Sequence, residues 1–88
     1  MPVFRIEFAP SAYRALGKLD PQIRARLAPH IAALANEPRA AGSKRLAGMD
    51  DLYRIRVGAY RIVYRVEDDV LIVLVLKLGH RRDVYRGR

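Results

Sequence analysis

With 88 residues the chain can form one small domain, residues 1–88, but no second core, and its 51% apolar share excludes a disordered protein. The lack of cysteine excludes disulfides and thiolate metal sites, and His30 and His80 lie far apart in the sequence, so we expect neither a metal nor another cofactor. The net charge of +8, carried mostly by arginine, favours a polyanionic partner such as nucleic acid, an acidic protein or anionic lipid.

Two features argue against export or membrane insertion. The N-terminal residues 1–7 lack the long apolar run of a signal peptide. The most apolar segment, residues 70–76, is much shorter than the ~20 residues that a membrane helix needs. We therefore expect a soluble, cytoplasmic protein that has no contact with a membrane.

The first third of the chain predicts a strand and a short helix. Residues 3–8 alternate between two sets of side chains, which is the pattern of a half-buried strand. A short helix is predicted over residues 11–18, with Tyr13 and Leu16 on its inner face.

A longer helix is predicted to begin at Asp20-Pro21 and to run to about Asn36. Asp can cap free amides and Pro tolerates the first helical position. Pro29 lacks an amide proton and should kink this helix. One apolar stripe with helical spacing is formed by Ile23, Leu27, Ile31 and Leu34.

The second half predicts three strands, residues 52–57, 60–66 and 70–78. Gly58-Ala59 forms a tight hairpin between the first two. The continuous apolar character of residues 70–78 predicts a central strand that is covered on both faces. The fold class is therefore α+β with the order β-α-α-β-β-β, a small, mainly antiparallel sheet with two N-terminal helices packed on one face.

Arginines alternate along the predicted hairpin. Arg54 and Arg56 project from one face of their strand, and Arg61 and Arg65 share a face of the next. Paired strands would bring these side chains into one patch, which would bind an anion or simply be a solvated face balanced by nearby acidic residues such as 67–69. Strand geometry alone leaves both interpretations open. The tyrosines of the hairpin, Tyr53, Tyr60 and Tyr64, lie on its apolar face and are expected in the core, while His30 is expected to be structural or exposed.

Three segments resemble one known family. Residues 52–66 (LYRIRVGAYRIVYRV) and 79–85 (GHRRDVY) strongly resemble the central hairpin and the C-terminal motif of RelE/ParE-superfamily toxins, and 44–48 (KRLAG) resembles the family's Leu-x-Gly element. The family's opening motif is matched only loosely, by Phe8, Ala12 and Leu16. The resemblance covers nearly the whole chain and implies a RelE-like microbial ribonuclease fold.

For RelE-type members the resemblance implies an endoribonuclease that enters the ribosomal A site and cuts mRNA without a metal ion. The 2′-hydroxyl attacks the adjacent phosphate, and positioned cations hold that phosphate and neutralise its developing charge. By position, Arg54 and Arg56 match two cationic residues, Arg61 and Arg81 match charge-stabilising arginines, and Tyr85 matches a tyrosine that stacks on a base.

One departure from the family pattern concerns proton transfer. The best-known RelE-type site has lysines at the positions of Arg54 and Arg56, and arginine does not release its proton as lysine can. His80 is the candidate general base, because histidine titrates near neutrality. General attraction to RNA is expected from Lys44, Arg45, Arg65, Lys77, Arg82 and Arg86.

Two other functions remain open, a ParE-like inhibitor of DNA gyrase and a nucleic-acid-binding module without catalysis. The set Arg54, Arg56, Arg61, Arg81 and Tyr85 favours the nuclease. The family also implies a cognate antitoxin that forms a hetero-oligomer with the toxin, besides the ribosome and mRNA. An acidic segment that folds on binding would suit the +8 surface, and we expect it to cover part of the arginine patch or to displace the tail that carries Tyr85.

Overall fold

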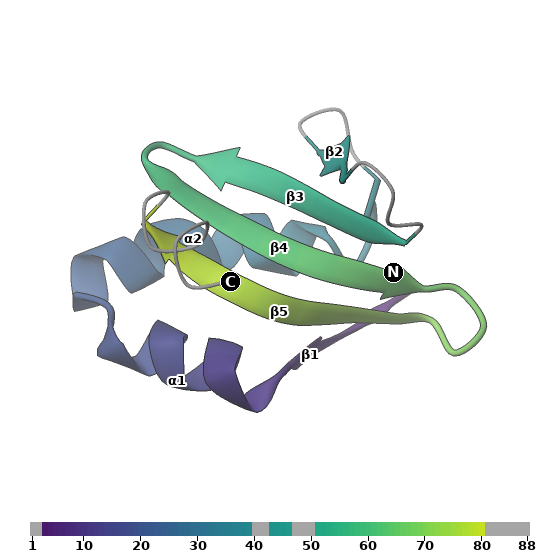
Figure 1. Ribbon diagram of the computed structural model, residues 1–88, viewed down its shortest axis with the longest axis horizontal. Helices are drawn as coiled ribbons and strands as arrows, with labels where there is room; N and C mark the ends of the chain where they lie inside the picture. The colour runs from purple at the N-terminus through teal and green to yellow at the C-terminus, as the bar shows by residue number, and fades with distance from the viewer. Residues whose placement is uncertain (1–2, 40–42, 47–50, 81–88) are drawn as a thin grey trace.

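The computed structural model describes residues 3–39, 43–46 and 51–80. Its elements, in chain order, are β1 (Arg5–Phe8), α1 (Pro10–Lys18), α2 (Pro21–Ala33), β2 (Lys44–Arg45), β3 (Leu52–Val57), β4 (Tyr60–Glu67) and β5 (Ile72–His80). The strands form one five-stranded sheet in the order β1-β5-β4-β3-β2 (Figure 1). Among these described strands, β1 and β5 pair in parallel, and the other neighbours are antiparallel. The predicted α+β class is confirmed, and β2 is an addition to it.

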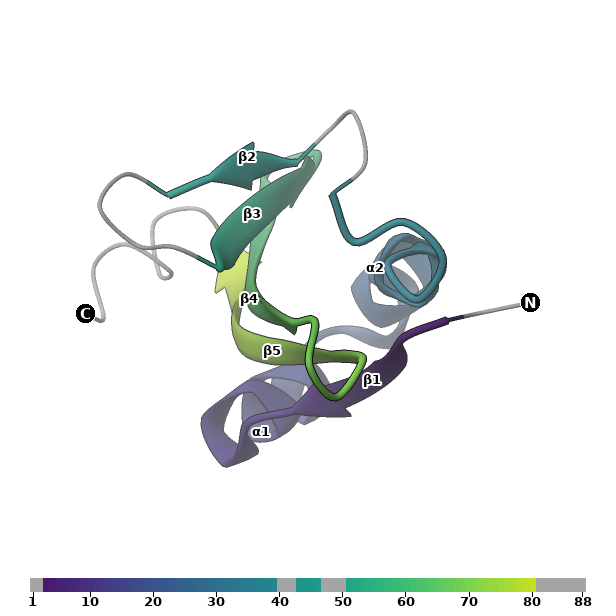
Figure 2. The ribbon, with the colours of Figure 1, turned by 90° about the vertical axis from the view of Figure 1, so that its right-hand side faces the viewer.

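Both helices contribute to a single core on one face of the sheet. Figure 2 shows α2 lying along the inner side of the curved sheet. Ala12 of α1 and Leu27 and Ile31 of α2 are buried there against strand residues such as Ile62 and Val75. In the part of the chain that the structure describes, no helix is long and apolar enough to span a membrane.

The short helix α1 has a different inner face from the predicted one. Ala12 is 1% exposed, whereas Tyr13 is 67% exposed, so the placement of Tyr13 on the inner face was wrong. Ala12 has the smaller side chain and allows the helix to approach the sheet closely, and the next residue then points about 100° away. The Tyr13 ring packs edge-on against Phe8, with ring centroids 6.4 Å apart. Leu16 is half-buried, one turn from Ala12.

The longer helix α2 begins as its sequence predicts. The Asp20 side chain accepts a hydrogen bond of 3.0 Å from the Gln22 amide, and Pro21 occupies the first helical position. The helix ends at Ala33, before the expected Asn36, because the chain turns over residues 34–36. Pro29 lies inside the helix. The predicted stripe is confirmed, since Leu27, Ile31 and Leu34 are buried and Ile23 is half-buried.

The three predicted strands of the second half are present with shifted ends, since β4 extends to Glu67 and β5 extends to His80, beyond the predicted residues 66 and 78. Gly58, at φ 61°, turns β3 into β4 as expected. Strand β5 begins at Ile72, not at Val70, because Val70 and Leu71 belong to the turn after β4 and are 59% and 45% exposed. Its central position, between β1 and β4, is confirmed. The prediction that both faces of β5 are covered was wrong in part. Val73 and Val75, on the helix side, are fully buried, but Ile72, on the other face, is only half-buried.

Candidate nucleic-acid interface

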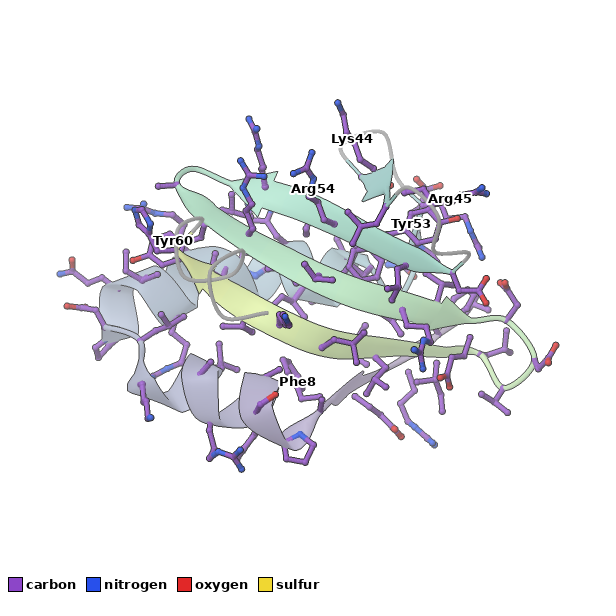
Figure 3. The ribbon with its side chains drawn as sticks, viewed as in Figure 1. Phe8, Lys44, Arg45, Tyr53, Arg54 and Tyr60 are labelled. Atoms are coloured by element: carbon purple, nitrogen blue, oxygen red, sulfur yellow. The ribbon has the colours of Figure 1, made fainter. Side chains whose placement is uncertain are left out.

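Strand register gathers cations on the face of the sheet opposite the helices. Lys44 pairs with Arg54, which pairs with Val63, which pairs with Lys77, so these four residues form one row across the sheet. Directly paired residues project to the same side of a sheet. Figure 3 shows Lys44 and Arg54 on neighbouring strands at the same rim.

A second row lies beside the first, toward the β3–β4 turn. It consists of Arg56 of β3, Arg61 of β4 and Gly79 of β5, which are successive partners in the register. Arg65 lies on the same face, opposite Leu52. The predicted common face of the hairpin arginines is therefore confirmed. We call this surface the arginine face, and its described residues are Lys44, Arg54, Arg56, Arg61, Arg65 and Lys77.

Paired arginines have an electrostatic cost that an anion would relieve. Arg56 and Arg61 are direct cross-strand partners, and Cβ atoms of such pairs are ~5 Å apart. Like charges at that spacing repel unless neighbouring groups or a bound anion offset them. Phosphate is well matched to guanidinium, which can donate two parallel hydrogen bonds to it. The arrangement therefore suits a phosphodiester chain running over the two rows.

The six cations differ in exposure. Arg61 is only 8% exposed, and among the residues that the structure describes it is the one charged side chain that is buried. Arg54 is half-buried, and the other four are exposed. A buried guanidinium requires compensating interactions, and both Arg54 and Arg61 have interaction partners in the folded chain. Arg61 is thus a fixed charge rather than a freely moving surface side chain.

Arg65 is partly neutralised at the rim of the face. Its guanidinium lies 3.9 Å from the Glu67 carboxylate, two residues along β4. Both side chains are substantially exposed, so this pair contributes little to stability. The solvated, counter-charged interpretation therefore applies to Arg65.

Two of the predicted site residues lie on the other side of the sheet. Arg45 pairs with Tyr53, and His80 pairs with Tyr60, so both are in register with the helix-facing residues. The ring of His80 contacts the ring of Tyr60 edge-on, with centroids 5.7 Å apart and an interplanar angle of 76°. Strand alternation separates His80 from Arg61, whose partner is the preceding residue, Gly79.

The tyrosines of the hairpin face the helices, as predicted. Tyr64 is fully buried, whereas Tyr53 and Tyr60 are half-buried against the core. His30 is exposed on α2. The remaining predicted residues, Arg81, Arg82, Tyr85 and Arg86, lie outside the residues that the structure describes. Within the described ranges, no group of three or more His, Asp or Glu side chains is placed to hold a metal ion.

Arg39 forms a cluster that the sequence did not predict. Its guanidinium donates hydrogen bonds of 3.2 and 2.7 Å to the two carboxylate oxygens of Asp68, and its Nε donates one of 2.9 Å to the Tyr53 hydroxyl. Arg39 also lies over the Tyr53 ring, 5.4 Å from its centroid. The bonds to Asp68 and Tyr53 raise the pKa of Arg39, and the Arg39 guanidinium lowers the pKa of the Asp68 carboxyl. Arg39 belongs to no motif, so its pairing with the distant β4–β5 turn had no sequence signal.

The Arg39–Asp68 pair predicts a pH-dependent effect on stability. Because the folded state depresses the Asp68 pKa, the pair stabilises the fold fully above the ordinary Asp pKa of about 3.9. That contribution is lost as the pH falls from there through the folded-state pKa. We expect Asp68→Asn to lower the midpoint of urea unfolding at pH 7 and to approach the wild type as the pH falls below the folded-state pKa of Asp68. Asp69→Asn removes the same charge from the same turn without breaking this pair, and equal effects of both substitutions at pH 7 would contradict the prediction.

A family model described as "ParE toxin of type II toxin-antitoxin system, parDE" matches residues 6–85. The chain is 32% identical over 84 residues to "Toxin RelG" of Mycobacterium tuberculosis, which covers 94% of this chain and 97% of that protein. It is also 32% identical over 78 residues to the "mRNA interferase toxin RelE" of Escherichia coli K12, which covers 86% of this chain and 81% of the relative.

Solved structures give the same result for the fold. The isolated E. coli RelE toxin superposes with a TM-score of 0.80 at 26% identity and covers 97% of this chain and 99% of its own. The toxin–antitoxin complex RelBE2 of M. tuberculosis contains a chain that superposes with a TM-score of 0.78 at 31% identity. The match covers 92% of this chain and 100% of that one. From its sequence, its sheet topology and these matches, this protein belongs to the RelE/ParE toxin family of type II toxin–antitoxin systems.

Proposed function

We propose that this protein is a RelE-like mRNA interferase, an endoribonuclease that cuts mRNA in the A site of the ribosome. The observation that carries the proposal is the pair of cationic rows that the register of β2 to β5 builds on one face of the sheet. The naming of the E. coli relative as an mRNA interferase toxin supports the same activity. Action on translating ribosomes would place the protein in the cytoplasm.

The proposed reaction is an in-line attack within the RNA. The 2′-hydroxyl oxygen bonds to the adjacent phosphorus, the bond to the 5′-oxygen breaks, and a 2′,3′-cyclic phosphate and a 5′-hydroxyl end result. Arg61 is suited to stabilise the charge that develops on the phosphate, because a buried, fixed guanidinium needs no reorganisation during the reaction. Arg54 and Arg56 would hold the phosphate from the neighbouring strand.

Other residues would have supporting roles. Arg81 is proposed to share the charge with Arg61, and Tyr85 to stack on and orient a base. Because guanidinium groups supply the positive charge, we propose a metal-independent step. Further attraction to RNA is proposed for Lys44, Arg45, Arg65, Lys77, Arg82 and Arg86. Arg45 should contribute less because it pairs with Tyr53 on the helix side of the sheet, and Arg65 should contribute less because it forms an ion pair with Glu67.

His80 stays the candidate for moving the proton of the 2′-hydroxyl, and this role sets a structural condition. Its ring must leave Tyr60 and turn around the end of β5 toward the row that contains Arg61. If it does so, His80→Ala should slow cleavage by about 10²–10⁴-fold and change the pH profile of the rate. Single-turnover cleavage measured between pH 5 and 9 tests this, with Tyr60→Phe as a control that keeps the ring contact. A wild-type rate and pH profile in His80→Ala would remove His80 from the mechanism.

The proposed function is tested by primer-extension mapping of mRNA on translating ribosomes with the purified protein. We expect cuts within the A-site codon that are absent without ribosomes. The cuts should be unchanged when the toxin has been stripped of metal with EDTA, freed of the EDTA and then added to ribosomes in magnesium buffer. Cuts that disappear with the metal-free toxin and return with an added transition metal would refute the metal-independent step. Absence of cutting under all conditions would refute the nuclease.

A second candidate is inhibition of DNA gyrase, which the ParE name of the matching family model favours. A supercoiling assay distinguishes it, because a gyrase inhibitor would block supercoiling and leave mRNA intact. RNA binding without turnover in either assay would instead indicate a non-catalytic binding module.

We also propose that a cognate antitoxin binds this protein in a hetero-oligomer. Relatives of the chain are found in solved toxin–antitoxin complexes from M. tuberculosis and E. coli. An apolar groove of about 260 Å³ lies between β1, α1 and α2, and its lining includes Phe8, Leu16 and Ile31. An acidic segment that folds on binding would place apolar side chains in this groove and carboxylates on the arginine face, or displace the tail that carries Tyr85. A complex that leaves both the arginine face and the tail that carries Tyr85 free would contradict this proposal.

A further inference from the structure

A groove of about 590 Å³ lies between the end of α2 and strand β3. Its lining includes Leu34, in the turn after α2, and Ile55 of β3, which are core residues with 3% and 8% exposure. Pro29 and Ala33 of α2 line it as well. A concave, largely apolar surface of this size is typical of sites that bind a small molecule or one group of a larger ligand. We call it the α2–β3 groove.

The α2–β3 groove is continuous with the arginine face at Arg56. This residue lines the groove and is also the β3 member of the second cationic row. Among the residues that the structure describes, β2 pairs with β3 at Tyr53 and Arg54, so the edge of β3 beside Arg56 lies beyond β2. A nucleotide whose phosphate is bound by Arg56 could therefore place its base in the groove.

Polar side chains at the groove are available to a ligand. His30, Asn36, Glu37 and Arg56 all line it. Within the described part of the chain, none of these four side chains forms a hydrogen bond or an ion pair, whereas Arg61 has partners in the fold. An imidazole ring can stack on a base, and amide and carboxylate groups can bind the edges of a base. The groove thus combines an apolar floor with groups that can recognise a base.

The fold holds Asn36 and Glu37 in place from both sides. Before them, the carbonyl oxygen of Ala35 accepts hydrogen bonds of 3.1 and 2.9 Å from two amides of the segment that leads into β1. After them, the carbonyl oxygen of Pro38 accepts a hydrogen bond from the hydroxyl of the buried Tyr64. Because this segment is already ordered, a ligand that binds its side chains loses less affinity to conformational entropy than one that binds a mobile loop.

The charges at the groove favour a nucleobase over a phosphate or an acidic peptide. The carboxylate of Glu37 would repel either anion. It can instead accept a hydrogen bond from the amino group of a base, as Glu does with the N4 amino group of cytosine. Adenine and guanine also have an amino group, and uracil has none. A base would thus enter the groove while its phosphate stays at Arg56.

We propose that the α2–β3 groove is a nucleobase-binding site for the RNA strand whose phosphates lie on the arginine face. The base lies over the apolar floor of Leu34 and Ile55, beside the ring of His30, and Glu37 accepts a hydrogen bond from its amino group. The groove makes the protein prefer bases with an amino group over uracil. The inference rests on the proposed function, because it takes RNA as the ligand of the arginine face.

The test compares the affinities of the purified protein for oligocytidylate and oligouridylate of equal length, measured by fluorescence anisotropy. The two bases have the same ring size, but cytosine has an amino group where uracil has a carbonyl oxygen. The wild type should bind oligocytidylate about three- to tenfold more tightly, as expected for one net hydrogen bond. Glu37→Gln keeps the size of the side chain but can also donate to uracil, so the preference should disappear. Glu7→Gln removes the same charge from β1, at the other edge of the sheet, and should keep the preference.

A second pair of variants tests the groove itself. Ala33→Leu adds a larger side chain to its wall and should lower the affinity for oligocytidylate to about that for oligouridylate. Ala25→Leu makes the same change at an exposed position of α2 that does not line the groove, and it should bind both oligonucleotides as the wild type does. Both alanines are exposed, so both variants should fold, which circular dichroism can verify.

Equal affinities of the wild type for the two oligonucleotides would overturn the nucleobase site while leaving the arginine face and the proposed nuclease in place. A preference that persists in Glu37→Gln and in Ala33→Leu would do the same. A wild-type protein that binds neither oligonucleotide and cuts no mRNA would overturn the proposed function and, with it, this inference.

Discussion

Arg61→Ala is expected to slow mRNA cleavage on ribosomes by about 10²–10³-fold, the loss typical for removing one group that stabilises transition-state charge. Arg61 is the buried member of the second cationic row, directly opposite Arg56. Because its position is fixed by the fold, neither water nor an arginine of another strand can supply the positive charge at this point once Arg61 is removed. The rate constant from single-turnover primer extension, with ribosomes in excess, measures the effect on the chemical step.

Two controls separate the chemistry of Arg61 from its charge and from folding. Arg26→Ala removes one positive charge from an exposed position on α2 and should cleave at nearly the wild-type rate. Arg61→Lys keeps the charge but loses the planar, two-pronged donor, so it should fall between wild type and Arg61→Ala. Because Arg61 has partners within the fold, thermal unfolding of each variant must show that it is folded at the assay temperature. Comparable rates for folded Arg61→Ala and Arg26→Ala would refute the role of Arg61.

Leu27→Ala should have a large effect on stability, a loss of about 2–5 kcal/mol in the free energy of unfolding. Leu27 of α2 is 0% exposed and belongs to the core between the helices and the sheet. The substitution leaves a cavity that a close-packed interior cannot fill completely. Small domains have ~5–15 kcal/mol of stability in total, so much of the reserve would disappear. Urea unfolding followed by circular dichroism measures this loss.

The matched control is an apolar residue of similar chemistry that the core does not enclose. Val70→Ala, in the turn before β5 where Val70 is 59% exposed, should change the free energy of unfolding by less than about 0.5 kcal/mol. Similar losses for Leu27→Ala and Val70→Ala would show that α2 is not packed on the sheet as described.

The features that the sequence predicted correctly depend on local rules. Strand alternation placed Arg54 and Arg56 on one face, and helical spacing identified the stripe that includes Leu27 and Ile31. The start of α2 followed from the capping chemistry of Asp20. Each of these depends on residues within a few positions of one another, so the pattern in the chain contains the necessary information.

Features that depended on which element packs against which were missed or misplaced. Tyr13 was expected with Leu16 on the inner face of the short helix, but Ala12 is the residue that packs against the sheet and Tyr13 points outward. His80 was expected to work beside the arginines as the candidate general base, yet pairing with Tyr60 places it on the helix side of the sheet. Neighbours in sequence lie on opposite faces of a strand, so proximity along the chain is a poor guide to a shared site.

The sequence by itself determined the α+β class, the order of the main helices and strands, and a hairpin with its arginines on one side. Only the tertiary structure decided that Arg61 is buried, that Arg39 binds Asp68, and that the Tyr64 hydroxyl binds the Pro38 carbonyl oxygen. The physical reason is that strand alternation and helix capping depend on residues a few positions apart in the sequence. Burial and long-range hydrogen bonds depend instead on how separate elements pack against one another.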